Sequence, residues 1–346
     1  MENKSKLIQE QFILRVKSAL ASNVSFVDEL ADLLQLSNDS AYRRIRCETL
    51  FNIEEITLIC KHFRVSFDPE VQHMSNKVTF DYLKLDDKKE NFKLWLSFIA
   101  GDVKKIGTSI NNQIIYGADD VPLWHHFFDR ELTAFKLFYW LKSILNAPEY
   151  ANENYDPALI DDEMLNSAAE MLKNYNEINS VEIWTEDTLN SNLKQVEYFF
   201  ESGFFNNKQD ALHLCDLYLE ELNLVLKKAT VSSKLIANGE SGRENFKLYK
   251  SEVMIGNNSI LANIGSTKIA YVSNNTFNMM STTSADFVHE NELWLNNLLR
   301  KSTLISGVGE KQRNQFFRVL RDKVDLLKQK LNWLNPNLCR LAFFVS

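Results

Sequence analysis

The chain contains few of the residues that interrupt helices. Only 10 of its 346 residues are glycines and only 5 are prolines. Globular proteins contain on average about 7% glycine and about 5% proline, so both residues are well below their usual frequency. A β-sandwich depends on frequent turns, and turns use these two residues. The scarcity argues against an all-β fold and favours long helices.

Cysteine and histidine are also scarce. The four cysteines, at positions 47, 60, 215 and 339, are too far apart for a disulfide framework or a zinc ligand pair. The six histidines form no pair of the HExxH kind. We therefore expect no metal site, no cofactor, and free thiols in a reducing cytosol.

Long apolar runs are absent, and the charge balance is acidic. The most apolar stretch, residues 135–145, is interrupted by Lys136 and Lys142 and is shorter than the ~18 residues of a membrane span. The charged first eleven residues do not resemble a signal peptide. We expect a cytoplasmic protein without membrane contact. With a net charge of −7, it would bind nucleic acid only through a local patch.

The length predicts more than one domain, since 346 residues at about 150 per domain give about 2.3 domains. We expect a helical headpiece in residues 1–68, a linker in 69–79 around Pro69, and a regulatory or oligomerisation region in 80–346. Within the headpiece, apolar residues recur at helical spacing in four segments. These segments are residues 6–21, with Leu7, Phe12, Ile13, Val16 and Leu20 inward, then residues 26–34, 37–46 and 53–63.

The region beyond residue 80 has a mixed pattern. Helices are predicted near 87–110, 129–146, 162–176, 187–203, 207–229, 285–301 and 310–333. A short strand is predicted at 181–184, and further β-type runs at 246–255, 259–264 and 268–272. Asn257-Asn258 and Gly265-Ser266 are predicted hairpin turns. We therefore expect a mainly α protein whose helix-rich α+β region has a small antiparallel sheet near 245–274, without βαβ alternation, and whose apolar tail from Leu334 docks on the body.

The segment from Val27 to Ile45, VDELADLLQLSNDSAYRRI, has the spacing of two helices that cross closely. Small side chains at Ala31 and Ala41 permit the close approach. Ser25 is the predicted N-cap of the first of these helices, with Asp28 as an acidic variant of the capping box. Ser37 is the predicted N-cap of the second. This pattern predicts a helix-turn-helix, in which one face of the second helix stays unburied. The inward positions are Leu30, Ala31, Leu34, Ala41 and Ile45.

The unburied face of the second helix is polar. With Ala41 and Ile45 inward, the 100° step per residue turns other side chains outward. Asparagine can form paired bonds to adenine and arginine to guanine, and aspartate can accept from the amino group of cytosine. The face therefore predicts contacts to bases in the major groove of double-stranded DNA. Asp39, Arg43 and Arg46 are predicted to point outward, with Ser40 and Tyr42 on the flanks and Asn38 in the exposed first turn.

Contacts to phosphate are predicted next to these side chains. Ser37 and the N-terminal amides of the same helix suit a phosphate group. Arg44 and Lys61 are candidate contacts to the DNA backbone, which position a protein without selecting a sequence.

Residues 7–68 resemble the Cro/C1-type (lambda-repressor-like) helix-turn-helix family. The resemblance includes IEEITLICKHFRVSFD at residues 53–68, which is similar to the family's fourth helix. The rest of the chain resembles Bacteroidetes-type regulators that join such a headpiece to a large uncharacterised C-terminal region. The resemblance implies that Arg46 contacts a base or the backbone, and that four residues face the bases. These four are Asn38, Asp39, Tyr42 and Arg43.

The chain departs from the family at two positions. Gln35 stands where the family usually has glycine in the turn, and Cys47 stands where glycine commonly follows the recognition helix. A left-handed backbone at a residue other than glycine costs about 1 kcal/mol or somewhat more.

The sequence thus predicts a DNA-binding transcriptional regulator with recognition helix 38–46, and not an enzyme. One short helix contacts few base pairs, so we expect a homodimer on two half-sites. Residues 80–346 would supply dimerisation or sense an effector of unknown identity. No catalytic motif is evident, because the segment Gly307–Lys311 lacks the full spacing of a phosphate loop.

A protein-binding adaptor, of the antitoxin or sigma-factor-partner type, is the main alternative. Residues 1–72 contain nine Lys and Arg against eleven Asp and Glu, whereas a DNA-binding domain is typically basic. Five of the nine basic residues lie between 43 and 64, on or beside the predicted recognition face. An enzyme in residues 80–346 is a third alternative, which titratable side chains converging in a deep pocket would support.

Overall fold

The computed structural model describes residues 2–20, 25–63, 65–67, 77–234, 236–237 and 240–333. The chain divides into two compact units, residues 1–80 and 81–346, here called the N-terminal and C-terminal units. Most of the expected linker and the expected docking of the tail lie outside the described residues. Among the described residues, no helix is both long and apolar enough to cross a membrane.

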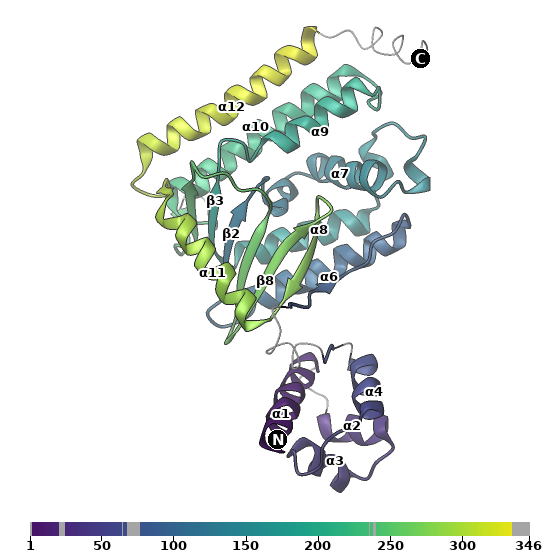
Figure 1. The fold of residues 1–346 in the computed structure, drawn as a ribbon. Coiled ribbons are helices and arrows are strands. Elements are labelled where there is room, and N and C mark those ends of the chain that lie inside the picture. The colour runs from purple at the N-terminus through teal and green to yellow at the C-terminus, as the bar shows by residue number, and fades with distance from the viewer. Residues whose placement is uncertain are drawn as a thin grey trace. The chain divides into compact units, whose positions relative to one another are not determined.

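The N-terminal unit is a helical headpiece, as the apolar spacing predicted (Figure 1). Ser37 caps α3, because its hydroxyl accepts a hydrogen bond from the amide of Ser40 at 3.3 Å. Ser25 stands at the N-cap position of α2, but its side chain makes no capping bond, and Asp28 accepts from Asn38 instead. The helices of this unit are α1 (Glu2–Ala19), α2 (Phe26–Leu34), α3 (Asn38–Ile45) and α4 (Ile53–Phe63).

The core of the N-terminal unit follows the predicted inward positions closely. Ala41 is fully buried and Ala31 is 4% exposed, and both belong to one apolar cluster, so the predicted burial of these two small side chains is confirmed. Leu7 was expected inward but is 55% exposed. The buried stripe of α1 continues through Gln9 instead, because Gln9 lies one helical turn before Phe12.

The two positions at which the Cro/C1-type family usually has glycine both have a left-handed backbone in this chain. Gln35 has φ 52° and Cys47 has φ 58°. The left-handed turn at Gln35 ends α2, and its backbone N–H bonds back to carbonyls of that helix. Leu36 also donates its N–H to the carbonyl of Ala31 at 2.9 Å. The geometry that glycine normally permits is therefore kept, at the cost of strain.

The C-terminal unit is built around one large mixed sheet, in the strand order β1-β9-β8-β7-β2-β3-β6-β10. Strand β3 pairs in parallel with both β2 and β6. All other pairs of neighbouring strands in this sheet are antiparallel. The strands are β1 (Asp81–Tyr82), β2 (Gln113–Ala118), β3 (Asn179–Trp184), β6 (Phe246–Lys250), β7 (Ser259–Ile264), β8 (Thr267–Asn274), β9 (Asn278–Thr282) and β10 (Thr303–Leu304), with β4 (Ile236–Ala237) and β5 (Glu240–Ser241) as a separate pair.

The expectation of a small antiparallel sheet near 245–274 was wrong. Two long crossovers join β2 to β3 and β3 to β6, and such connections produce the parallel pairs that we did not expect. The turn at Gly265-Ser266 does join paired strands, β7 and β8. Asn257-Asn258 does not, because β6 and β7 pair with other strands. The side chain of Asn258 instead binds Asp120 at 2.7 Å, in the loop after β2.

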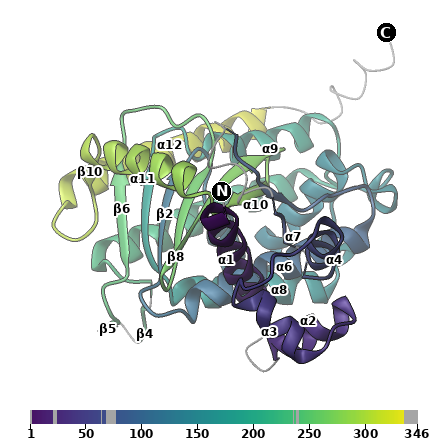
Figure 2. The same cartoon turned by 60° about the horizontal axis from the view of Figure 1, so that its bottom comes forward.

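Helices cover both faces of the sheet (Figures 1 and 2). Most of the apolar core lies between one face and α6, α7, α8, α9, α10 and α12, while α11 packs on the other face. The helices are α6 (Lys89–Gly107), α7 (Arg130–Tyr139), α8 (Asp162–Asn176), α9 (Asn190–Glu201), α10 (Lys208–Val231), α11 (Ala285–Arg300) and α12 (Glu310–Trp333). Shorter turns are η1 (Leu123–Phe128), η2 (Trp140–Ile144), η3 (Pro148–Tyr150) and η4 (Pro157–Leu159).

A carboxylate lies at the centre of this unit. Glu182 of β3 is fully buried, and His125 Nε2 lies 2.9 and 3.0 Å from its two oxygens. The indole of Trp184 and the hydroxyl of Tyr175 also donate to it. Burial acts to raise the pKa of Glu182, but His125, Tyr175 and Lys234 outweigh it and hold the pKa below 4.5.

We predict that acidification destabilises the C-terminal unit in two stages. Burial lowers the pKa of His126 in the folded protein below its ordinary value of 6.5. As the pH drops below 6.5, the unfolded chain therefore binds a proton at His126 that the folded chain does not bind, and the folded state loses stability. Glu182 stabilises the fold above 4.5, and that contribution disappears as the pH falls through its folded pKa. Denaturant unfolding across this pH range checks both stages. His126→Gln should remove the upper stage, and His213→Gln, at an exposed histidine, should leave it.

We also predict that Gln35→Gly stabilises the N-terminal unit by about 0.5–1 kcal/mol, because glycine adopts the left-handed backbone without strain. Gln35 is exposed, so little packing is lost. Hydrogen exchange of the amides of α2 and α3 measures the change. Gln35→Ala is the matched control, since it removes the side chain but keeps the Cβ. Equal stabilisation by both variants would contradict the prediction.

Candidate functional site

The candidate site is the outer face of α3, an eight-residue helix. Its buried residue is Ala41, against α2. The side chains of Asp39, Arg43 and Arg46 are 78%, 61% and 66% exposed. Tyr42 is 46% exposed, and Asn38 is exposed as well. One helix face and its C-cap thus carry all five of the predicted base-contacting side chains.

Weak contacts arrange these side chains. Asn38 Nδ2 donates to Asp28 of α2 at 3.1 Å. Arg43 Nε lies 3.3 Å from the carboxylate of Asp39, one turn earlier. The guanidinium of Arg46 lies over the ring of Tyr42, 5.6 Å from its centre. Exposed pairs of this kind contribute about 0–1 kcal/mol each, so the side chains can exchange them for other partners at small cost.

Arg44 is placed differently from the other predicted residues. Its Nε and Nη2 donate to Glu55 of α4 at 3.0 and 2.7 Å, and the two side chains are 17% and 12% exposed. Glu55 also accepts from the amide of Asn52 at 3.0 Å, at the start of α4. Arg44 therefore ties α3 to α4 and is turned away from the exposed face, and its expected contact to the DNA backbone stays a prediction.

Two predicted phosphate contacts lie outside the main face. Lys61 is exposed near the end of α4. Ser37 is exposed at the start of α3, where its oxygen already accepts from the amide of Ser40. The structure therefore brings Ser37 next to the polar face, whereas Lys61 belongs to another helix.

The sequence did not reveal the importance of Gln9. This side chain of α1 is 5% exposed, and its Nε2 donates to the carbonyls of Arg44 and Thr49 at 2.8 and 2.9 Å. Its Oε1 accepts from the amide of Phe51 at 2.7 Å. Gln9 thus holds the end of α3 and the loop after it. A polar residue in the apolar stripe of a helix was the signal that could have identified it.

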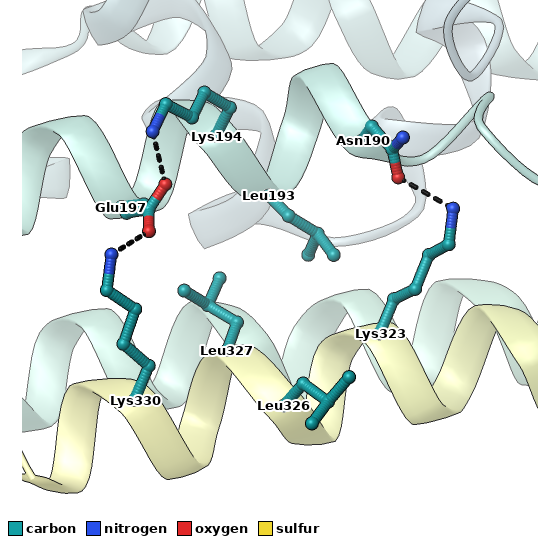
Figure 3. Close-up of a pocket in the computed structure, with 8 residues that line it drawn as sticks. All are labelled: Asn190, Leu193, Lys194, Glu197, Lys323, Leu326, Leu327 and Lys330. Carbon is teal, nitrogen blue, oxygen red and sulfur yellow. Dashed lines mark hydrogen bonds and ion pairs between the residues drawn. The ribbon is translucent and has the colours of Figure 1, made fainter.

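A surface groove of about 280 Å³ lies between α9 and α12 (Figure 3). Three leucines line it, Leu193, Leu326 and Leu327. Its lysines are already paired: Lys330 with Glu197 and Glu201, Lys194 with Glu197, and Lys323 with Asp187. The groove is therefore a seam between two helices, lined by leucines and by lysines that have acidic partners.

Neither metal chemistry nor similarity to known proteins assigns a function. In the part of the chain that the structure describes, no group of three or more histidine, cysteine, aspartate or glutamate side chains could hold a metal ion. Comparisons of the chain with protein-family models, with curated proteins and with solved structures found no match. The geometry of α3 is therefore the main basis for a functional proposal.

We predict that Gln9→Met destabilises the N-terminal unit by about 1–3 kcal/mol. Methionine has a similar volume, but it leaves two carbonyls and one amide without their partner. Hydrogen exchange at Thr49 and Phe51 should accelerate more than in the C-terminal unit. Gln11→Met, at an exposed position of the same helix, is the matched control. Equal effects of the two substitutions would show that the three bonds contribute nothing.

Proposed function

We propose that this protein is a sequence-specific, double-stranded-DNA-binding transcriptional regulator of the Cro/C1-type. In this proposal α2, the turn at Gln35 and α3 form a helix-turn-helix, and α3 enters the major groove. The observation that carries the proposal is the exposed polar face of α3, on a helix whose opposite side is anchored by Ala41, Arg44 and Gln9.

The chemistry of the face supports contacts to bases. Arg43 can leave Asp39 and donate both of its outer nitrogens to guanine, and Asn38 can leave Asp28 to pair with adenine. Asp39 can accept from the amino group of cytosine. Tyr42 and Arg46 lie at the C-terminal part of the face, where Arg46 can reach a base or a phosphate.

Contacts to phosphate would fix the orientation of the helix. The amide end of α3 behind Ser37 favours an anion, and Lys61 supplies a charge on α4. Arg44 has a different role in this proposal, because it positions α3 through Glu55. We further propose that the protein binds as a homodimer, with the C-terminal unit supplying dimerisation or effector sensing.

A protein-binding adaptor is the second candidate, and one observation favours it. Three apolar side chains that follow α3 in the sequence are exposed. These are Leu50 at 42%, Ile53 at 82% and Leu58 at 45%. Apolar side chains on a small, mildly acidic unit suit a protein partner.

Salt dependence distinguishes the two candidates. The full chain is titrated with fluorescently labelled random duplex DNA at about 50 and about 200 mM salt. Each phosphate contact contributes about 0.9 to the slope of log K against log salt, so DNA binding requires a marked loss of affinity as salt rises. A lack of binding at low salt, or an affinity that salt does not change, would favour the adaptor.

We predict that Arg43→Ala relaxes sequence preference at one base pair by about 1–3 kcal/mol. The site is first selected from random DNA with the unaltered protein. Binding of the variant to this site and to its single-base substitutions is then measured. Arg318→Ala removes an exposed positive charge from α12 in the C-terminal unit and should leave the preference unchanged. If Arg43→Ala keeps the full preference, Arg43 does not contact a base.

A further inference from the structure

Helix α11 packs by itself, in the described part of the C-terminal unit, on its face of the large sheet (Figure 2). It lies over the middle of the sheet, where Ser259 of β7 pairs with Gly117 of β2. The hydroxyl of Ser259 donates to Asn291 Oδ1 at 2.8 Å. A Cβ atom on Gly117 would meet Trp294 and Leu295 at 3.3 Å. These two small residues of the sheet therefore allow the helix to lie close to it.

The contacts of α11 with the sheet determine which of its side chains points outward. On one flank of the helix, Glu292 pairs with Lys268 of β8 at 2.6 Å. On the other flank, Trp294 lies over β2. Successive side chains of a helix are about 100° apart, so Leu293 points away from the sheet. Leu293 is 50% exposed and Trp294 is 40% exposed, and both lie at the middle of α11.

The charges on the outer face of α11 are separated by sign. Asp286 lies seven residues before Leu293 and Arg300 lies seven residues after it, so the three side chains share one line along the helix. Glu290 adds a second acid to the first half, and Lys301 adds a second base at the C-cap. All four charged residues are exposed, and their charged groups form no ion pair within the described part of the chain.

The outer face of α11 is complementary to itself. Acidic starts and basic ends stabilise any helix through its dipole, so the feature that points to a partner is the exposed Leu293 midway between them. At 1.5 Å per residue, Asp286 and Arg300 are about 21 Å apart on their own helix and cannot pair there. A second α11 in antiparallel orientation, related by a twofold axis beside Leu293, brings each Asp286 opposite the Arg300 of the other copy.

Exposed apolar side chains beside α11 widen this face. Tyr249 of β6 packs against the apolar cluster under α11, and it pairs across the strands with Leu304 of β10, which is 38% exposed. Side chains of paired residues point to the same face of a sheet. The loop after β6 contributes Ile255 to the same cluster, and the adjacent Met254 is 87% exposed. Apolar surface of this kind suits a protein partner.

We propose that two copies of this chain associate through the outer face of α11, with the two helices antiparallel. Leu293 and Trp294 of both copies form the apolar centre of the interface. At each end, Asp286 of one copy pairs with Arg300 of the other. The inference rests on the homodimer proposed above and assigns its interface. It does not depend on α3, so it is tested in the absence of DNA.

Sedimentation velocity of the full chain, from about 1 to about 200 µM, measures the association. A single pair of helices is a small interface, so we expect a reversible monomer–dimer equilibrium with a Kd in the micromolar range. Leu293→Glu places two carboxylates beside the twofold axis and should raise the Kd at least about tenfold. Leu293 is half-exposed, so the melting temperature of the monomer should change little.

Two charge reversals are the decisive variants. Asp286→Arg places an arginine opposite Arg300 of the second copy, and Arg300→Asp places an aspartate opposite Asp286. Each variant should therefore weaken its own dimer about tenfold. When the two variants are mixed, both ends of the heterodimer carry opposite charges, so the heterodimer should form about as tightly as the dimer of the unaltered protein. A structural role within one chain would not produce this rescue.

Asp322→Arg is the matched control, because it makes the same charge change at an exposed position of α12. It should leave the Kd unchanged. A chain that stays monomeric up to about 200 µM would overturn both this interface and the proposed homodimer, without bearing on DNA binding by α3. A dimer that Leu293→Glu and both charge reversals leave unchanged uses another surface, so the homodimer would be kept and this interface rejected. Weakening by both reversals without rescue in the mixture would overturn the antiparallel arrangement.

Discussion

A short helix with one exposed face cannot hold its own position, and this constraint governs the N-terminal unit. Helix α3 has eight residues, too few to be stable alone, and its buried side is little more than Ala41. Gln9 and the pair of Arg44 with Glu55 supply the remaining fixation. These bonds use polar groups at the end and the inner edge of the helix, which leaves the outer face available for a partner.

The C-terminal unit has a buried carboxylate between its sheet and its helices. Around Glu182 the donors come from β3, from the end of α8 and from η1, so the carboxylate joins the sheet to the helices on one face. Glu182 is fully buried, so these protein donors replace the water that would surround an exposed carboxylate.

Helices could be predicted from the sequence far better than the sheet. The apolar spacing marked residues 162–176 and 310–333, which are the bounds of α8 and α12. Strands β2 and β9 were missed, and β6 and β7 were wrongly joined across Asn257-Asn258. Helical hydrogen bonds connect residues four apart, so a short stretch of sequence is enough to predict them. A parallel pair such as β2 and β3 connects residues more than 60 apart, so no short stretch of sequence predicts which strands will pair.

The sequence by itself determined the helices of the N-terminal unit, the burial of Ala31 and Ala41, and which side chains of α3 could face outward, because all of these follow from helical periodicity. Only the tertiary structure decided that Arg44 turns toward Glu55 and that Gln9 holds the loop after α3. It also decided which buried polar atoms of the C-terminal unit have protein partners. Those outcomes depend on contacts between segments distant in sequence, where geometry selects one partner among several of suitable chemistry.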